Sequence, residues 1–407
     1  MNGNRIRLIV WAVSIVSICF PTSIFAASRF NIKPRISTSW KVDSNFYKSE
    51  YLEREVYTYT VSPGLRTEFE SAKTNLMLDY STGFIYYRDQ DTVPVGEKSA
   101  DNEDYLGHTF IGEARYQAFD RLLVGLNGSY YLTRDPAQSD TLGNSIDRDK
   151  YSITRIEPII LYNFGPKFTV GLRYRNTKLD YSPENREDSN EDRGIFNLVY
   201  NFTTKMSMDL EYQYWKKYYN FNTSDYTSHQ AKLNFRRQFS IFKLAVGAGY
   251  QKRTFDDPGL DDESAFTYNL NFGAGKAFTI ANRRTRVSFS IEQNLNDQSE
   301  GNNYFIATRF VLNVGHDFTR KVSGGLGAYY QRSNYLNTYG LNSDGAIEKR
   351  EDNTYDYFGK INYKFARWLV FSVTGGLEKR DSNIAGLSYT DTYFIANLGF
   401  AYDLGKK

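Results

Sequence analysis

The chain is organised by a two-residue alternation of apolar and polar positions, and Gly194–Trp215 shows it most clearly. Apolar side chains occupy every second position from Phe196 to Phe202 and again from Met206 to Tyr214. A period of two is that of an extended strand, and the short connection between the runs indicates an antiparallel hairpin. One face of this hairpin is continuously apolar, whereas the other carries amides and ionised groups.

The same pattern recurs along the chain and predicts about 18 strands, each close to the roughly 9–11 residues that cross a bilayer at barrel tilt. Besides the two strands of the opening stretch, the predicted strands are Ile32–Val42, Val56–Phe69, Leu76–Tyr87, Asp104–Tyr116, Leu122–Arg134, Tyr151–Phe164, Phe168–Lys178, Thr227–Arg236, Ile241–Phe255, Ala265–Phe278, Thr285–Gln293, Tyr304–Phe318, Val322–Gln331, Thr354–Phe365, Trp368–Lys379 and Tyr393–Leu404. Pro63 predicts a bulge or imperfect pairing, because proline cannot donate to a ladder. A parity change near Arg155 predicts a second bulge.

The predicted connections alternate between short and long. Short turns such as Gly165–Lys167 are basic, and long connections such as Asp89–Glu103 and Asp180–Arg193 are mostly acidic. Short turns on one side and long loops on the other are typical of an outer-membrane barrel with periplasmic turns. A β-sandwich would give no reason for this alternation and would need a second sheet to cover every apolar face. The sequence therefore predicts an all-β fold, a single closed antiparallel transmembrane β-barrel of about 18 strands, with 16 to 18 as the range.

The N-terminus reads as a secretory signal. Arg5 and Arg7 precede the apolar run Leu8–Phe20, which is too short to span a bilayer, and small residues then favour cleavage after Ala26. We therefore expect residues 1–26 to be a signal peptide and residues 27–407 to form the barrel. Cys19, the one cysteine, would leave with the signal, so the exported chain has no disulfide.

Composition agrees with an exported barrel. The chain has 34 Tyr and 29 Phe but only 9 Pro, and its mean hydropathy is −0.56. Strands of transmembrane barrels are only half apolar and carry aromatic girdles at both interfaces, which gives this combination. The formal net charge of +3 says little, because the charges are segregated along the chain.

If the apolar faces contact lipid, many ionised side chains face the lumen. The predicted pore-lining residues are Arg35, Arg66, Glu68, Asp79, Glu113, Arg115, Arg173, Arg175, Asp209, Glu211, Lys232, Lys243, Arg309, Lys360, Lys364 and Glu378, with Lys33, Glu157 and Glu292 on the same face. So many ions need water or partners, and about 18 strands enclose more space than side chains fill. The excess of basic residues predicts that the pore prefers anions. Alternatively, these residues pair with acidic residues across the strands and leave little net electric field in the lumen.

The sequence gives no sign of catalysis. His108, His229 and His316 all share the lipid-facing parity near strand ends, where an amphipathic ring suits the membrane interface. Asp256-Asp257 and Asp261-Asp262 lack the spacing of a dedicated calcium loop. We expect no catalytic residue, no cofactor, no bound metal and no nucleic-acid partner.

Several short motifs resemble the putative β-barrel porin 2 family. They are Pro34-Arg35-Ile36-Ser37, Asp43-Ser44-Asn45-Phe46, Val61-Ser62-Pro63-Gly64-Leu65, Leu78-Asp79-Tyr80 and Tyr86-Tyr87. The resemblance implies an outer-membrane barrel of the kind associated with exopolysaccharide or capsule systems. It also implies a role as the export conduit, with a periplasmic polysaccharide-export protein as partner.

Three functions are therefore open at this point. The first is a polysaccharide-export conduit, the second a general or solute-selective diffusion porin, and the third a non-conducting barrel whose loops bind a partner. In each case the expected location is the Gram-negative outer membrane, where the barrel contacts lipid and lipopolysaccharide. The cargo would be a polysaccharide or a small solute.

Overall fold

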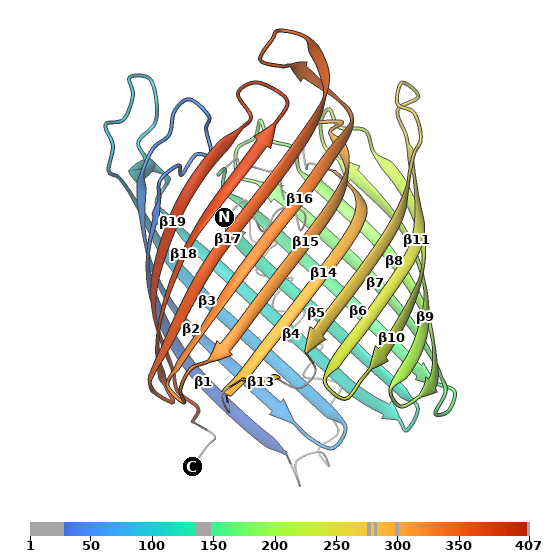
Figure 1. Cartoon of the computed structure of the whole chain (residues 1–407). Helices are drawn as coiled ribbons and strands as arrows, with labels where there is room; N and C mark the ends of the chain where they lie inside the picture. Colours follow the sequence, from blue (N-terminus) through green and yellow to red (C-terminus); the bar gives the residue numbers. More distant parts are fainter. Residues whose placement is uncertain (1–27, 135–147, 275–277, 281–282, 298–300, 405–407) are drawn as a thin grey trace.

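The computed structural model describes residues 28–134, 148–274, 278–280, 283–297 and 301–404, and they form one antiparallel sheet that closes into a barrel (Figure 1). The predicted signal peptide lies outside these residues. The strands are β1 (Arg29–Asp43), β2 (Val56–Glu70), β3 (Thr74–Asp89), β4 (Tyr105–Phe119), β5 (Leu122–Thr133), β6 (Tyr151–Asn163), β7 (Phe168–Tyr181), β8 (Ser189–Thr203), β9 (Met206–Tyr219), β10 (Tyr226–Gln238), β11 (Phe242–Phe255), β12 (Glu263–Ala274), β13 (Phe278–Ile280), β14 (Arg283–Asp297), β15 (Tyr304–Asp317), β16 (Val322–Leu341), β17 (Ile347–Ala366), β18 (Leu369–Ser382) and β19 (Tyr389–Ala401). A short helix, η2 (Ala100–Glu103), lies in the connection between β3 and β4. Within the described ranges, no helix is long and apolar enough to cross a membrane.

The barrel has 18 positions around its circumference, as the alternation predicts. β12 and β13 both pair with β14, so they are two segments of one position in the wall. Their registers against β14 differ by two residues, because Gly273 faces Ser288 whereas Phe278 faces Thr285. Apart from β12 and β13, every two consecutive strands pair with each other, and β1 pairs with β19 to close the ring.

The two faces of the sheet divide the side chains as predicted. On β9, Leu210, Tyr212 and Tyr214 are 42–45% exposed on the outer face, whereas Asp209, next to Leu210 on the other face, is 2% exposed. Rows of exposed Leu, Phe, Tyr, Ile and Val occur on the same parity of most other strands. In a membrane protein such an apolar exterior is the lipid contact surface, so the polar face lines the interior.

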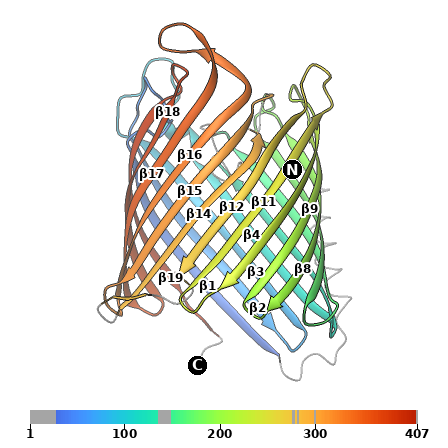
Figure 2. The ribbon, with the colours of Figure 1, turned by 45° about the vertical axis from the view of Figure 1, so that its right-hand side comes forward.

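Short turns and long loops lie at opposite ends of the barrel. Figures 1 and 2 place the short turns at the lower end and the long connections at the upper end. The prediction of alternating connections is confirmed. The strands β16 and β17 extend beyond the wall as a long hairpin, so the connection between them is only residues 342–346.

Of the two predicted bulges neither forms, but the alternative predicted for Pro63, imperfect pairing, is confirmed. No register shift occurs at Arg155, because β6 keeps one register with β5 and with β7. Its apparent parity change arises because Tyr151 and Ile153 are apolar residues buried on the inner face near the loops. At Pro63 there is no bulge either, but the pairing of β2 with β3 skips Ser62 and Pro63, which is the imperfect ladder expected for a residue without an N–H.

Candidate functional site

The inner face carries a network of charged side chains, and the contact between Arg35 and Asp79 shows how it is built. Arg35 on β1 reaches over β2 to donate to both carboxylate oxygens of Asp79 on β3, at 2.8 and 2.5 Å. The residue opposite Arg35 on β2 is Gly64, and a Cβ there would lie 2.9 Å from the Arg35 Nε. A glycine at this position therefore leaves room for the guanidinium to cross the strand.

Most of the predicted lumen residues contact a residue of opposite charge on the same face. These contacts join Arg66 and Glu68 (2.7 Å), Arg173 and Glu211 (3.4 Å), Arg175 and Glu157 (2.6 Å), Arg236 and Asp209 (2.9 Å), Arg309 and Glu292 (3.6 Å), and Lys33 and Glu68 (2.5 Å). Arg115 donates to the Asn127 amide oxygen at 2.7 Å, and Glu113 lies beside Arg66 and Glu68. Lys243, Lys360 and Lys364 line three separate hollows toward the short-turn end. Cross-strand pairing thus neutralises a large part of the inner face.

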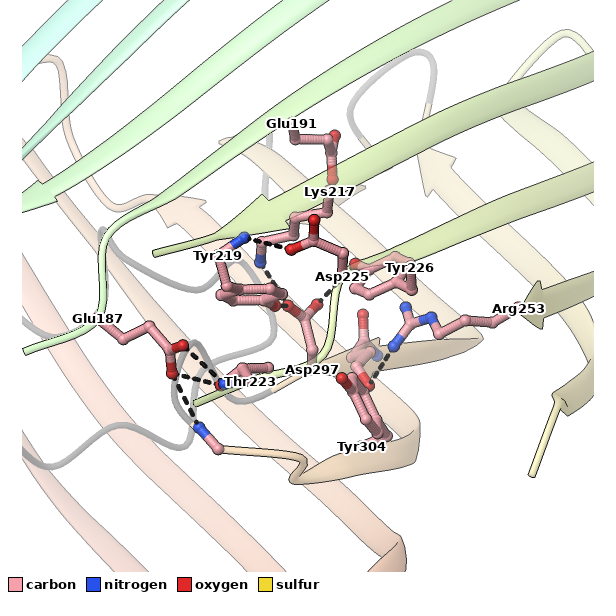
Figure 3. Close-up of polar contacts among 12 residues, drawn as sticks. Glu187, Glu191, Lys217, Tyr219, Thr223, Asp225, Tyr226, Arg253, Asp297 and Tyr304 are labelled. Carbon is pink, nitrogen blue, oxygen red and sulfur yellow. Dashed lines mark hydrogen bonds and ion pairs between the residues drawn. The ribbon is translucent and has the colours of Figure 1, made fainter. Parts of the chain in front are cut away.

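The end of β14 leaves the barrel wall and enters the lumen. Its ladder with β12 stops at Tyr268 and Gln293, although β12 continues back to Glu263. β14 itself continues to Asp297, where it pairs with Tyr304 of β15. We call residues 294–297 and 301–304 the inner tip. Figure 3 shows the inner tip surrounded by side chains from other strands.

Asp297 holds the inner tip against β9, which is not adjacent to β14 in the wall. Its carboxylate pairs with the Lys217 ammonium and accepts a hydrogen bond from the Tyr219 hydroxyl, both on β9 (Figure 3). The Tyr226 hydroxyl of β10 also donates to Asp297, at 3.4 Å. Strands β10, β11 and β12 separate β9 from β14 in the sheet, so these contacts can form only across the interior.

Arg253 of β11 holds the backbone of the same segment. Its guanidinium donates to the carbonyl oxygens of Asn296 at 3.4 Å and Leu295 at 3.5 Å, and it lies 3.9 Å from the centre of the Tyr226 ring. Arg253 is 1% exposed, so this arginine is fixed between the wall and the inner tip. Charge-assisted hydrogen bonds of this kind are about twice as strong as neutral ones.

The far side of the inner tip is held by the neighbouring loops. Glu187 accepts hydrogen bonds from the backbone and hydroxyl of Thr223 and from the Gly301 N–H (Figure 3). Gly301 has a φ of +65°, a conformation that favours glycine. The Asn302 amide oxygen accepts from the Ser224 N–H at 2.9 Å. The inner tip is therefore anchored by several elements and narrows the lumen near the long-loop end.

Beside the inner tip lies a cavity of about 450 Å³, which we call the cationic cavity. It is lined by seven basic side chains and three carboxylates. The basic residues are Arg155, Arg175, Arg193, Lys217, Lys232, Arg253 and Arg309, and the acids are Glu191, Glu292 and Asp297. Arg193 pairs with Glu191 at 2.8 Å and stacks on Trp215, with its guanidinium 4.1 Å from the ring centre. The wall of this cavity carries an excess of positive charge.

A second long connection, residues 44–55, also occupies the interior. Lys48 pairs with Glu378 of β18 at 2.9 Å and with Asp391 of β19 at 2.6 Å. The predicted lumen residue Glu378 is therefore in contact with this loop. Burial lowers the pKa of Lys48, but the two carboxylates outweigh that effect and raise the pKa above its usual value. Phe46 of this loop packs with Val56, Tyr87 and Ala100.

The inner tip was not predicted from the sequence. Asn294–Asn303 is rich in Asn, Asp and Gly, which is typical of any long loop, whether it folds inward or outward. The sequence carried one signal. Lys217 and Arg253 are cations at inner-face positions near the loop end of their strands, and cations at such positions need partners. Alternation assigns each side chain to a face of the sheet, but it could not say that Lys217 and Arg253 meet the end of β14, which is not a neighbour of β9 or β11 in the sheet.

His108 and His229 lie beside exposed tyrosines, as expected, whereas His316 contacts the buried Thr285. His108 and His229 contact the hydroxyls of Tyr80 and Tyr212, at 2.9 and 2.7 Å, and His316 contacts the Thr285 hydroxyl at 2.8 Å. Tyr80 and Tyr212 are 44% and 42% exposed on the apolar exterior. Tyrosine and histidine together suit the polar edge of a membrane.

Solved structures share this fold. A crystal structure of Pseudomonas aeruginosa OpdK with vanillate has a TM-score of 0.50 and 11% identity, covering 91% of this chain and 99% of that one. Pseudomonas aeruginosa OccK9 (OpdG) has a TM-score of 0.50 and 9% identity, covering 92% and 98%. A search of curated proteins finds no match.

A family model described as putative beta-barrel porin 2 matches residues 243–402, which run from β11 to the end of β19. The match covers the C-terminal strands, whereas the motifs that carry the resemblance in the sequence lie in the N-terminal strands. The chain thus has the closed β-barrel fold of these solved porins, and its resemblance to the putative beta-barrel porin 2 family is confirmed over residues 243–402.

Proposed function

We propose that this protein is a diffusion pore of the Gram-negative outer membrane for small solutes, with a preference for anions. The observation that carries the proposal is the cationic cavity beside the inner tip, where seven basic side chains face three carboxylates. A water-filled passage lined with one excess charge raises the local concentration of the opposite ion. Narrowing by the inner tip brings a passing solute close to these charges.

Small-solute diffusion is favoured over polysaccharide export. Both the inner tip and the loop that carries Lys48 occupy the long-loop end of the interior, which leaves less room for a polymer than an empty ring of 18 strands would. The shared fold of the solved porins is consistent with this choice, although at about one-tenth identity it speaks for the fold alone. The periplasmic polysaccharide-export partner, the contact with lipopolysaccharide and the cleaved signal peptide stay predictions.

Conductance of the purified protein in planar bilayers tests the proposal. We expect discrete conductance steps and a reversal potential that favours chloride over potassium. Absence of steps would instead support the non-conducting, surface-binding alternative. A deletion strain that takes up small anions normally but lacks surface polysaccharide would overturn diffusion in favour of export.

A further inference from the structure

Apart from Arg253, which binds the backbone of the inner tip, two basic residues of the cationic cavity have no carboxylate to pair with among the described residues. Arg155 donates to the Thr177 hydroxyl at 3.3 Å, and within the described part of the chain no carboxylate oxygen lies within 4.0 Å of its guanidinium. The same holds for the ammonium of Lys232. The acids that influence Lys232 most are Glu211 and Glu292, and these already pair with Arg173 and Arg309. Both cations are half-buried, so water screens them only in part.

Two buried donors in the same wall also lack an acceptor among the described residues. They are the indole Nε1 of Trp215 and the Nε of Arg253, on side chains that are 3% and 1% exposed. A buried donor without a partner lowers the stability of the fold by about 1–3 kcal/mol. Such groups in native structures therefore commonly bind a ligand or a water molecule. The cavity therefore has an excess of positive charge and of hydrogen-bond donors, which suits an anionic acceptor.

The rest of the lining indicates which other chemical groups the anionic ligand carries. Gln213, Gln230, Asn294 and Asn296 offer amide groups, which can both donate to and accept from hydroxyls. Trp215 and Tyr226 add aromatic surface. A volume of about 450 Å³ falls within the usual range for small-molecule sites. Cations, amides and aromatic rings together fit a molecule that carries a carboxylate and several hydroxyls.

We propose that the cationic cavity is a binding site for acidic sugars, in which Arg155 and Lys232 hold the carboxylate and the amides bind the hydroxyls. The proposal deepens the pore function and rests on it, because the solute must reach the cavity through the lumen. The same chemistry is presented by a free sugar acid and by one unit of an acidic polysaccharide. The two sources are distinguished by the length of the probe.

The test is calorimetric titration of the full-length protein in detergent with glucuronate, with glucose as the neutral sugar of the same size, at low salt. We expect saturable binding of glucuronate and at least tenfold weaker binding of glucose. The double variant Arg155→Gln with Lys232→Gln should weaken glucuronate binding at least tenfold. The matched control is Arg332→Gln with Lys379→Gln, which removes the same two residue types from exposed ion pairs with Glu351 and Asp381.

A second titration uses short oligomers of glucuronate. Equal affinity for monomer and oligomer would identify a free sugar acid as the ligand, and an oligomer that binds at least tenfold more tightly would identify a polymer. Equal binding of glucose and glucuronate, or an equal loss in the control variant, would overturn the site. Binding in a protein that does not conduct would overturn the diffusion pore and leave the site standing, whereas conductance without saturable binding would do the reverse.

Discussion

The ammonium of Lys217 on β9 pairs with the carboxylate of Asp297 on β14, although three strands of the wall lie between them. Both side chains are less than one-fifth exposed. Breaking a buried pair by removing one partner typically costs about 3–5 kcal/mol, because the other charge is left buried and alone. This contact, together with the hydrogen bond from Tyr219, therefore joins the inner tip to β9.

Asp297→Ala should release the inner tip and enlarge the pore. We expect at least a twofold increase in single-channel conductance with noisier open states, measured in planar bilayers. Lys217→Met combined with Asp297→Met should restore most of the lost stability, since no isolated charge remains. Asp381→Ala, which removes the acid of a half-exposed pair with Lys379, is the control and should leave conductance unchanged. An unchanged conductance in Asp297→Ala would show that the contact does not hold the inner tip.

Gly64→Val should displace Arg35 from Asp79. A Cβ at position 64 would lie 2.9 Å from both the Arg35 Nε and the Tyr80 carbonyl oxygen. Asp79 is 8% exposed and would lose its bidentate partner, so we expect the free energy of unfolding to fall by about 1–3 kcal/mol. The urea midpoint of the barrel in lipid vesicles measures this. Gly273→Val, where nothing lies within 4 Å of the added Cβ, should have a much smaller effect; equal losses in the two variants would contradict the explanation.

Glu103 should make the loop between β3 and β4 less stable as the pH rises. Burial raises the pKa of its carboxyl above the usual value, although Arg134 and Arg148 oppose the shift. The folded protein then binds more protons than the unfolded chain between the two pKa values, so stability falls as pH rises through this window. We expect Glu103→Gln to slow proteolysis of the loop at pH 7 and to have no effect near pH 4. The exposed Glu97→Gln in the same loop is the control, and a benefit of Glu103→Gln that persisted at pH 4 would rule out this cause.

The preference for anions should depend on salt. The Debye length falls from about 10 Å at 0.1 M to about 3 Å at 1 M, so charges on the lumen wall act on a passing ion only at low salt. We expect reversal potentials to show chloride preference at 0.1 M KCl and nearly none at 1 M. Cation preference at 0.1 M would contradict the proposed role of the cationic cavity.

The wall of the barrel was largely predictable, because its pattern is local. Side chains alternate along a strand whatever the rest of the chain does, so the hairpin of β8 and β9 could be recognised from Gly194–Trp215 alone. The alternation failed only where an apolar residue faces the interior. Ile153 is such a residue: it packs under the loops with Tyr151 and Leu179 and suggested a bulge that does not exist.

The interior was less predictable, because its contacts join strands that are distant around the ring. Sequence parity put Arg173 and Glu211 on one face, but only the register places them 3.4 Å apart. The partner of Lys217 depends on how far the end of β14 bends inward, which no repeat in the sequence encodes. The excess of positive charge beside the inner tip follows from that bend, because Asp297 pairs with Lys217 whereas Arg155 and Lys232 face the cavity.

The early end of the ladder between β12 and β14 also sets how deep the protein can sit in its bilayer. From Glu263 to Thr267, the side of β12 turned away from β11 has no backbone ladder with β14, although the Phe266 carbonyl accepts a hydrogen bond from the Gln293 side chain at 2.7 Å. Acyl chains offer nothing for a bare amide or carbonyl to bond, so this stretch must stand among hydrated headgroups or higher. The pair Tyr268–Gln293 thus marks the outer limit of the hydrocarbon core on that side of the barrel.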